Sequence, residues 1–426
     1  MERRDDTYQE YLNILKSELV PAFGCTEPIA LAYAAAVARK TLGEIPDKVI
    51  VCVSGNIIKN VKSVVVPNTG GLVGIEAAVA AGIVAGEEER KLEVLSNITQ
   101  EQISAINEYL KKECIEVRMS ESSYIFDISI SVYYKDSDAR VRIVGKHTNI
   151  VSIEKDGAVL YSGSCFGEQE ESSSGGYDSL TIEGIVQFAD MVDMEDIREV
   201  IGRQIEYNMA IAREGMENEY GADIGQVLIK CYGDSTNVRA KAYAAAGSDA
   251  RMAGCSLPVV ICSGSGNQGI TASVPVIVYA TDKHIDEERL YRALVVSDLV
   301  TIHVKSGVGR LSAYCGVVCA GCGSGAGIAY LMGESCKVIQ HTIVNTLAIT
   351  SGIICDGAKA SCAGKIAVSV DAGILGYEMY KNGKQFRAGD GIVTKGVENN
   401  IVNIGRLARD GMRQTDKEIL NIMMEK

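Results

Sequence analysis

The stretch FDISISVYYKDSDARVRIV, residues 126–144, decides the fold class of this chain of 426 residues. Apolar and polar residues alternate on both sides of a turn at residues 135–138, which is the pattern of two half-buried strands. The period of two extends over residues 115–161, where Asp156-Gly157 offers a second hairpin turn. The sequence therefore predicts a sheet in this segment. Its apolar positions include Phe126, Ile128, Ile130, Val132, Val141 and Ile143.

The segment before this sheet is mostly helical in pattern. Residues 8–19 and 29–42 have apolar or alanine-rich helical spacing, and Pro21–Pro28 interrupts them. Residues 74–86 predict a buried alanine-rich helix, and residues 101–112 predict an amphipathic helix.

Two short apolar runs between these helices have the composition of strands. They are residues 49–53 and 61–66, with Gly55 and Asn56 supplying the turn between them. The sequence therefore predicts two further strands here.

The chain after the sheet changes character. Residues 163–176 are rich in Ser, Glu and Gly and predict a surface loop or a domain boundary, and mostly helix-forming residues with frequent glycine follow. We therefore predict an α+β fold. Its N-terminal helix-and-sheet part, with the loop that contains Cys25, spans residues 1–170, and a largely helical, glycine-rich part spans residues 171–426.

Composition excludes several classes of protein. The 42 basic and 55 acidic residues give a net charge of −13, which disfavours binding to nucleic acid or to an anionic membrane surface. Residues 252–281, 311–333 and 338–355 lack charged side chains, but their Pro, Asn, Gln, His and Gly content predicts buried segments rather than membrane spans. The sequence leaves a homo-oligomer open.

Thirteen cysteines in a chain of this length are too few for a disulfide-stapled scaffold. The first ten residues are rich in charge and have no apolar run behind them, so no signal peptide is expected. We therefore expect a cytoplasmic protein whose thiols stay free, bind metal or take part in chemistry.

The loop PAFGCTEP, residues 21–28, contains the first candidate functional thiol. Cys25 precedes a helix with Pro28 in its first turn, and the positive end of a helix dipole lowers the pKa of a nearby thiol. Cys25 is thus a candidate base or nucleophile, and Glu27 could serve instead as a capping carboxylate in the first turn of the helix. A capping loop with a passive thiol is the structural alternative.

The turn GSGNQGIT, residues 264–271, is similar to a phosphate-binding loop, but Ile270 occupies the position of the essential lysine. A substrate carboxylate fits such a turn better than a nucleotide phosphate does, because backbone amides converge at the helix that follows. Ser265, Asn267 and Gln268 are therefore candidate substrate-binding residues, and a plain turn before a helix is the alternative. Lys59 and Asn60 are fainter candidates for the same role.

Two groups of cysteines occur near the uncharged stretches. In a helix, the spacing of Cys315, Cys319 and Cys322 would place the first and last roughly 10 Å apart, too far for both to bind one cluster. A stripe of small residues for close helix packing is the alternative there. Cys355 and Cys362 flank a glycine-containing loop, and Lys359 and Lys365 are the only cations that the sequence places nearby. Two buried core cysteines are the alternative for this pair.

Three ordered motifs together point to a known family. With PAFGCTEP at 21–28, SGSGNQG at 263–269 and CDGAK at 355–359, the sequence resembles the L-cysteine desulfidase family, which is related to the alpha chain of bacterial iron–sulfur L-serine dehydratases. The resemblance implies a 4Fe–4S cluster held by three cysteines with one iron open to substrate. It places the ligands at Cys315, Cys355 and Cys362, with Cys319 or Cys322 as substitutes for Cys315, and the proton acceptor at Cys25.

The implied reaction is β-elimination of a small amino-acid substrate, L-cysteine, to pyruvate, ammonia and hydrogen sulfide. Such a reaction needs a base for the α-proton and a Lewis acid for the leaving group. L-Serine dehydratase activity at the same cluster is the nearest alternative, and a non-enzymatic thiol-rich redox or metal-binding protein is the second. Because Cys25 has to reach the cluster, we expect the active site between the two parts of the chain.

Overall fold

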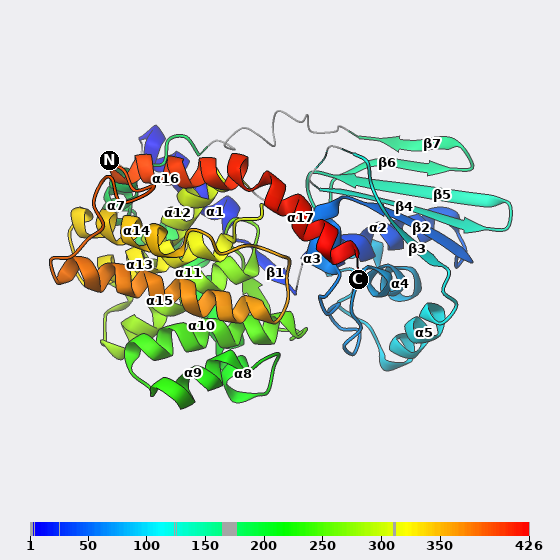
Figure 1. Ribbon diagram of the computed structural model, residues 1–426. Helices are drawn as coiled ribbons and strands as arrows, with labels where there is room; N and C mark the ends of the chain where they lie inside the picture. The colour runs from blue at the N-terminus through cyan, green and yellow to red at the C-terminus, as the bar shows by residue number, and fades with distance from the viewer. Residues whose placement is uncertain are drawn as a thin grey trace.

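The computed structural model describes residues 3, 5–24, 26–122, 124, 126–163, 177–309 and 312–425. Figure 1 shows two lobes, one made almost wholly of helices and the other of helices against a sheet. Each lobe has its own hydrophobic core. The structure thus confirms the predicted α+β class, with the sheet in the N-terminal half and helices in the C-terminal half. The predicted surface loop at 163–176 lies almost entirely outside the described residues.

The sheet lobe contains six strands in the order β3-β2-β4-β5-β6-β7. The β2–β3 pair is parallel and the other pairs are antiparallel. Ile130 lies opposite Val141 on one side and Val51 on the other, so the alternating apolar residues share one face. The strands are β2 (Lys48–Val53), β3 (Ile115–Met119), β4 (Asp127–Tyr134), β5 (Ser137–Val144), β6 (Ile150–Lys155) and β7 (Ala158–Ser162).

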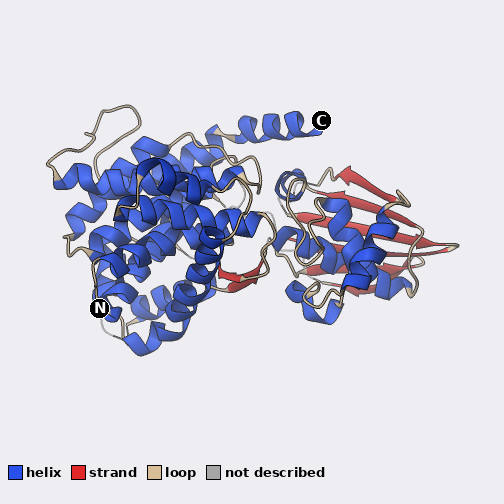
Figure 2. Cartoon of the chain, turned by 90° about the horizontal axis from the view of Figure 1, so that it is seen from below, coloured by secondary structure: helices blue, strands red, loops and turns tan. Residues whose placement is uncertain are grey.

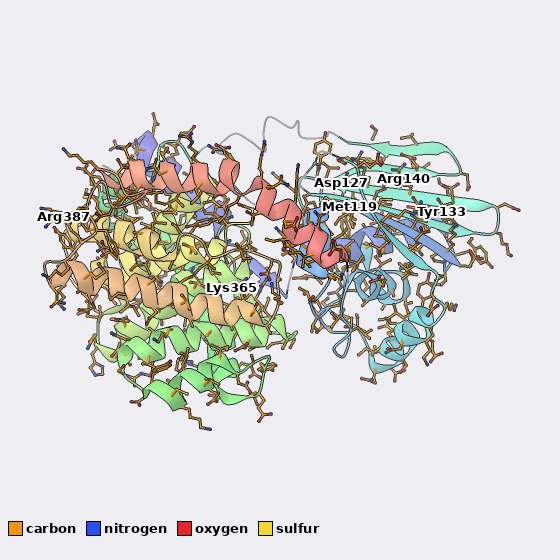
Figure 3. All side chains as sticks on the ribbon, viewed as in Figure 1. Met119, Asp127, Tyr133, Arg140, Lys365 and Arg387 are labelled. Atoms are coloured by element: carbon orange, nitrogen blue, oxygen red, sulfur yellow. The ribbon has the colours of Figure 1, made fainter. Side chains whose placement is uncertain are left out.

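Helices cover the apolar face of this sheet, as Figure 2 shows. The opposite face is polar, and Figure 3 labels Asp127, Tyr133 and Arg140 on it. Both Arg142 and Arg140 pair there with β4, and Arg142 makes two hydrogen bonds of 2.9 and 2.8 Å to Asp127. The lobe's helices are α2 (Thr26–Leu42), α3 (Gly55–Val61), α4 (Ile75–Ala85), the 3-10 helix η1 (Glu88–Glu93) and α5 (Gln100–Leu110).

The predicted strand at 61–66 is wrong, and the predicted turn at Gly55 and Asn56 is instead the start of helix α3. Ile57, Ile58 and Val61 are buried at helical spacing, and this burial overrides the strand preference of β-branched residues. Val65 forms only an isolated bridge with Val73. The other predicted helices and strands of this half of the chain are confirmed, including the strand at residues 49–53.

The helical lobe collects segments from both ends of the chain. Tyr8 and Tyr11 of α1 pack on Phe188 of α7, with ring centroids 5.2 and 5.6 Å apart. Strand β1 (Pro21–Phe23), within the interruption predicted at Pro21–Pro28, pairs with β8 (Pro258–Val260) in a two-stranded ribbon. The helices are α1 (Asp6–Glu18), α7 (Ile182–Met191), α8 (Met194–Glu217), α9 (Ile224–Tyr232), α10 (Thr236–Met252), α11 (Gly266–Asp282), α12 (Glu287–Val308), α13 (Gly316–Leu331), α14 (Cys336–Thr350), α15 (Ser361–Lys381), α16 (Val397–Arg406), the π-helical η2 (Leu407–Gly411) and α17 (Arg413–Met424).

Helix α13 lies at the centre of this lobe and is buried from Val317 to Leu331. Its glycines allow this packing, because a Cβ at Gly323 would lie 2.0 Å from the Thr301 hydroxyl of α12 and one at Gly325 would lie 2.9 Å from Gly373 of α15. The three uncharged stretches therefore lie largely in buried helices of a packed core, as predicted. Over the part of the chain that the structure describes, every helix is too short or too polar to cross a membrane.

The C-terminal helix α17 joins the two lobes. Figure 1 shows it leaving the helical lobe and ending beside α3. Asp416 of α17 forms an ion pair with Lys59 of α3 at 2.5 Å, and Lys62 donates a hydrogen bond to the Met423 carbonyl. Leu420 packs so closely on Gly55 that a Cβ there would lie 2.6 Å from it. Lys59 is thus held between the lobes.

One carboxyl group is buried in the helical core beside the thiol of Cys262. Asp298 of α12 has no exposed surface, and Gln204 Nε2 donates to its Oδ1 at 2.9 Å. Among the described residues, neither Asp298 Oδ2 nor Gln204 Oε1 has a hydrogen-bond partner. Burial raises the pKa of Asp298 to about 7, because the charged form is poorly solvated there.

The Asp298→Asn variant should therefore change how stability depends on pH. A carboxyl whose pKa is near 4 in the unfolded chain and near 7 in the folded one binds more protons when folded, so its contribution to stability is lost as pH rises through 7. Between the two pKa values, about pH 4 and pH 7, the free energy of unfolding falls by up to about 1.4 kcal/mol per pH unit. We expect the Asp298→Asn variant to lack this loss. Its free energy of unfolding, measured with urea, should therefore rise relative to that of the wild type between pH 5 and pH 7.

The exposed turn residue Asp136 supplies the control, because Asp136→Asn removes a carboxyl without changing a buried one. Parallel stability curves for the wild type and Asp298→Asn across this pH range would contradict the assignment.

Candidate functional site

A short pairing of two loops brings Cys315 and Cys355 together. Tyr314 and Ile354 form an antiparallel bridge. The Cys315 amide donates to the Ile353 carbonyl at 3.0 Å, and the Cys355 amide donates to the Ala313 carbonyl at 2.6 Å. Cys315 is also the residue directly before α13 and is almost fully buried. Two thiols that are 40 positions apart in sequence therefore share one site.

The third predicted ligand, Cys362, joins them from the first turn of α15. The loop that leads to it turns at Gly357, whose φ is +97°. A Cβ at this position would lie 2.0 Å from the Lys59 carbonyl oxygen, so the close approach of α3 requires a glycine here. The loop and α3 thus form one packed unit, and Cys362 lies close enough to Cys355 for the two sulfur atoms to interact electrostatically.

The three thiols are electrostatically unlike one another. A hydrogen bond from the Cys315 thiol lowers the pKa of Cys355 to about 5, and Lys59, Lys305 and the Gly357 amide act in the same direction against the effect of burial. The same hydrogen bond and burial raise the pKa of Cys315. Burial also raises the pKa of Cys362. Cys355 is therefore the sulfur atom most readily present as a thiolate.

Two buried lysines supply positive charge to this site. The Lys59 side chain is 1% exposed, and Lys305, near the end of α12, is 5% exposed as a residue. Burial lowers the pKa of Lys305, while Cys319, Cys355 and Cys315 oppose that change. Lys305 donates a hydrogen bond to the Gly309 carbonyl, and no described carboxylate pairs with it.

The expectation that Lys359 and Lys365 are the only cations near the cysteines is wrong. Both pair with Asp356, and the Lys359 ion pair measures 2.5 Å. Figure 3 shows Lys365 at the end of α15 that faces the sheet lobe. The sequence could not reveal Lys59 as a neighbour, because it is about 300 positions away and reaches the cysteines only through the contact with Gly357.

Cys319 and Cys322 lie inside α13 and have no exposed surface. Burial raises the pKa of Cys319 to about 11, although Lys305 opposes this, and it raises the pKa of Cys322 as well. These two thiols are therefore enclosed in the helical core, and the proposed substitution of either one for Cys315 stays a prediction.

The donor set suits an iron–sulfur cluster. Cys315, Cys355 and Cys362 lie near one another beside two cations, and thiolates are the usual ligands of such clusters. Within the ranges that the structure describes, no three His, Cys, Asp or Glu side chains converge tightly enough to hold a single metal ion. A cluster spreads its ligands over several iron atoms, so its thiolates need not converge on one point.

The glycine-rich turn before α11 lies beside this site. Ser265 caps the helix, since its hydroxyl accepts a hydrogen bond from the Gln268 amide at 3.5 Å. The Gln268 side chain packs on Gly316, the neighbour of Cys315, and among the described residues its Oε1 has no partner. Asn267 accepts a hydrogen bond from Arg251 at 3.3 Å. Asn60, next to Lys59, is 7% exposed.

Cys25 lies outside the described residues, so its role stays a prediction. The residue before it, Gly24, is described: its φ is +60°, and its carbonyl accepts a hydrogen bond from Arg251 at 2.9 Å. Sequence reasoning missed Arg251, Lys305 and Asp416. A signal existed for Arg251, which is the last charge before the uncharged stretch at 252–281.

Comparison with known proteins supplies the family. A UPF0597 protein of Desulfitobacterium hafniense (strain Y51) is 60% identical over 426 residues, which is 100% of this chain and 98% of the relative. UPF0597 proteins of Lachnoclostridium phytofermentans and Finegoldia magna are 47% and 48% identical over 417 and 419 residues, 98% of this chain and 100% of each relative. The sequence profile described as serine dehydratase alpha chain matches residues 89–421. This chain belongs to the serine dehydratase alpha chain family.

Proposed function

We propose that this protein is an iron–sulfur-dependent lyase that converts L-cysteine and water to pyruvate, ammonia and hydrogen sulfide. The observation that carries the proposal is the gathering of Cys315, Cys355 and Cys362 beside two buried lysines. Membership of a family described as serine dehydratase alpha chains supports elimination of a β-substituent from an amino acid. The choice of cysteine over serine rests on the motifs that resemble L-cysteine desulfidases.

Cys315, Cys355 and Cys362 would hold a 4Fe–4S cluster through three of its iron atoms. When bound, such a cluster with one open iron supplies a Lewis acid for a departing sulfur or oxygen atom. The ammonium groups of Lys59 and Lys305 offset the negative charge that three thiolates bring into a buried site. The bridge between Tyr314 and Ile354 supports the role of these cysteines as ligands, because it brings the backbones of Cys315 and Cys355 together.

Cys25 is proposed as the base. As a thiolate it takes the proton from Cα, the electron pair of that bond forms the Cα–Cβ double bond, and the Cβ–S bond breaks with its electrons on sulfur. The sulfur leaves as hydrosulfide and the remaining aminoacrylate takes up water to give pyruvate and ammonia. Asn267 and Gln268 lie beside Gly316 and Arg251, where they could orient the polar end of the substrate.

L-Serine is the second candidate substrate, favoured by the description of the family profile. The two amino acids differ by one atom at Cβ, and a sulfur leaving group suits soft iron better than oxygen does. Protein purified without oxygen should release pyruvate from L-cysteine with a kcat/KM about tenfold or more above that for L-serine. Equal or better turnover of serine would make the protein a serine dehydratase, and no turnover of either would overturn both assignments.

Replacing a proposed ligand should remove iron. In Cys355→Ser, and likewise in Cys315→Ser and Cys362→Ser, we expect bound iron to fall well below the roughly four atoms per chain of a full cluster, because serine supplies no thiolate. Iron, sulfide and visible absorbance measure this directly. Cys336→Ser, in the separate helix α14, is the matched control. A full iron content in Cys355→Ser would exclude the cluster at this site. Loss of iron in Cys319→Ser but not in Cys315→Ser would make Cys319 the ligand in place of Cys315.

Removing the proposed base should separate cluster from catalysis. Cys25→Ala is expected to keep its iron and visible absorbance but to lose about 100-fold or more of its kcat, which is the usual contribution of a general base. Cys52→Ala, in strand β2 of the sheet lobe, is the control for loss of a partly buried thiol elsewhere. Undiminished turnover by Cys25→Ala would remove Cys25 from the mechanism.

A further inference from the structure

Arg251 is a buried cation without an acidic partner among the described residues. It lies in the last turn of helix α10, and the whole residue is 7% exposed. The acidic residue nearest to it along the helix, Asp249, is engaged with the backbone amides of Ala222 and Ile224 at 3.3 and 2.8 Å. A buried charge is costly unless an opposite charge or several hydrogen bonds compensate it.

The guanidinium group keeps most of its donors unused. A guanidinium has five N–H donors. Nη2 donates to the Gly24 carbonyl at 2.9 Å and Nη1 donates to Asn267 Oδ1 at 3.3 Å. Nε is buried and has no acceptor among the described residues. Among the described residues, three of these donors therefore have no acceptor, and a carboxylate is the group that an arginine fork matches best.

The glycine-rich turn provides room for this group. A Cβ at Gly266 would lie 2.4 Å from Arg251 Nε and 2.8 Å from its Cζ, so the guanidinium rests directly on the turn. Gly266 is also the first residue of α11, and the first amides of a helix have no acceptor within the helix. The unused donors of Arg251 thus lie where a helix N-terminus also favours an anion.

This position is next to the cysteine site. Met252, which follows Arg251, packs in a small cluster with Val64 and with Cys362. Asn267 contacts both Arg251 and Met252, since its Oδ1 accepts a hydrogen bond from Arg251 and its Nδ2 lies 3.7 Å from Met252 Sδ. On its other side, Arg251 binds the carbonyl of the residue before Cys25. Arg251 therefore contacts the residue that precedes Cys25, and the next residue of α10 packs against a proposed cluster ligand.

Another arginine of this chain shows what a structural role requires. Arg289 ties the end of α13 by donating through Nε to the Leu331 carbonyl at 2.7 Å and through Nη2 to the Tyr330 carbonyl at 2.9 Å. Arg289 uses its Nε in this tie, whereas Arg251 leaves its Nε buried and unused. Arg39 also has a buried, unpartnered Nε and a tie to one carbonyl, that of Gly86, but its guanidinium lies 4.0 Å from the Glu88 carboxylate. Arg251 has no such carboxylate among the described residues.

We propose that Arg251 binds the α-carboxylate of the substrate and thereby restricts this site to free α-amino acids. The proposal rests on the proposed function for the kind of ligand, an amino acid. It assigns to Arg251, with the first turn of α11, the binding of the carboxylate, and leaves to the proposed cluster ligands and to Cys25 the roles proposed for them above.

The test compares L-alanine with L-alaninamide, because neither has a leaving group and they differ only in the carboxylate. Calorimetry on anaerobically purified protein with its iron content measured should show that the wild type binds alanine about 100-fold more tightly, as expected for two charge-assisted hydrogen bonds. In Arg251→Gln this ratio should fall to near one. Arg289→Gln, which also loses ties to carbonyls, should keep the full ratio.

Arg251→Lys keeps a positive charge but not the fork, so its ratio should fall about tenfold. This variant decides the question if Arg251→Gln fails to fold. A ratio near one in the wild type, or a full ratio in an Arg251 variant with normal iron content, would overturn the proposal.

Failure of the proposed function gives a different result. In that case neither L-cysteine nor L-serine is turned over, while the alanine ratio and its dependence on Arg251 persist. If the protein turns over cysteine or serine but the ratio of alanine to alaninamide affinity is unchanged in the Arg251 variants, only the inference about Arg251 is overturned.

Discussion

The contact between Gly357 and the Lys59 backbone is the constraint on which the candidate site depends. Gly357 belongs to the loop between Cys355 and Cys362, and Lys59 belongs to a helix of the other lobe. A side chain at position 357 would lie 2.0 Å from the Lys59 carbonyl oxygen, so the two backbones can meet only at a glycine with positive φ. This one approach places a cation from the sheet lobe beside thiols from the helical lobe, and α17 reinforces it through Asp416.

The burial of the thiols explains why cations gather around them. Sulfur atoms inside a packed helical lobe are poorly solvated, and burial raises the pKa of Cys315, Cys319, Cys322 and Cys362. Only Cys355 departs from this, because a neighbouring thiol, two lysines and a backbone amide all favour its thiolate. The small residues of α13 allow tight packing beside the site, and the α13 thiols Cys319 and Cys322 are fully buried in this packing.

Local sequence patterns predicted most of the fold. The features that they missed, helix α3 and the contacts of Lys59 and Arg251, depend on packing between residues that are distant in sequence. The alternation at 126–144 predicted the sheet because its period is set by neighbouring residues. Residues 55–61 form a helix instead of a turn, because packing of Ile57 and Val61 decided the conformation of a run with strand-like composition. Motif resemblance predicted three cysteines that the fold does bring together. Lys59 and Arg251 act through contacts across 298 and 227 positions, which no local pattern encodes.

The buried cations of the site differ in how much of their charge and how many of their hydrogen-bond donors the described residues already use. Lys59 is already paired with Asp416, so an incoming carboxylate would have to compete with that ion pair. Lys305 faces the cysteines and donates to the Gly309 carbonyl, so its charge acts on sulfur. Arg251 alone combines a buried charge, unused donors and a place next to the residue that precedes Cys25. A division of labour follows in which the lysines stabilise the thiolates and the arginine binds the substrate carboxylate.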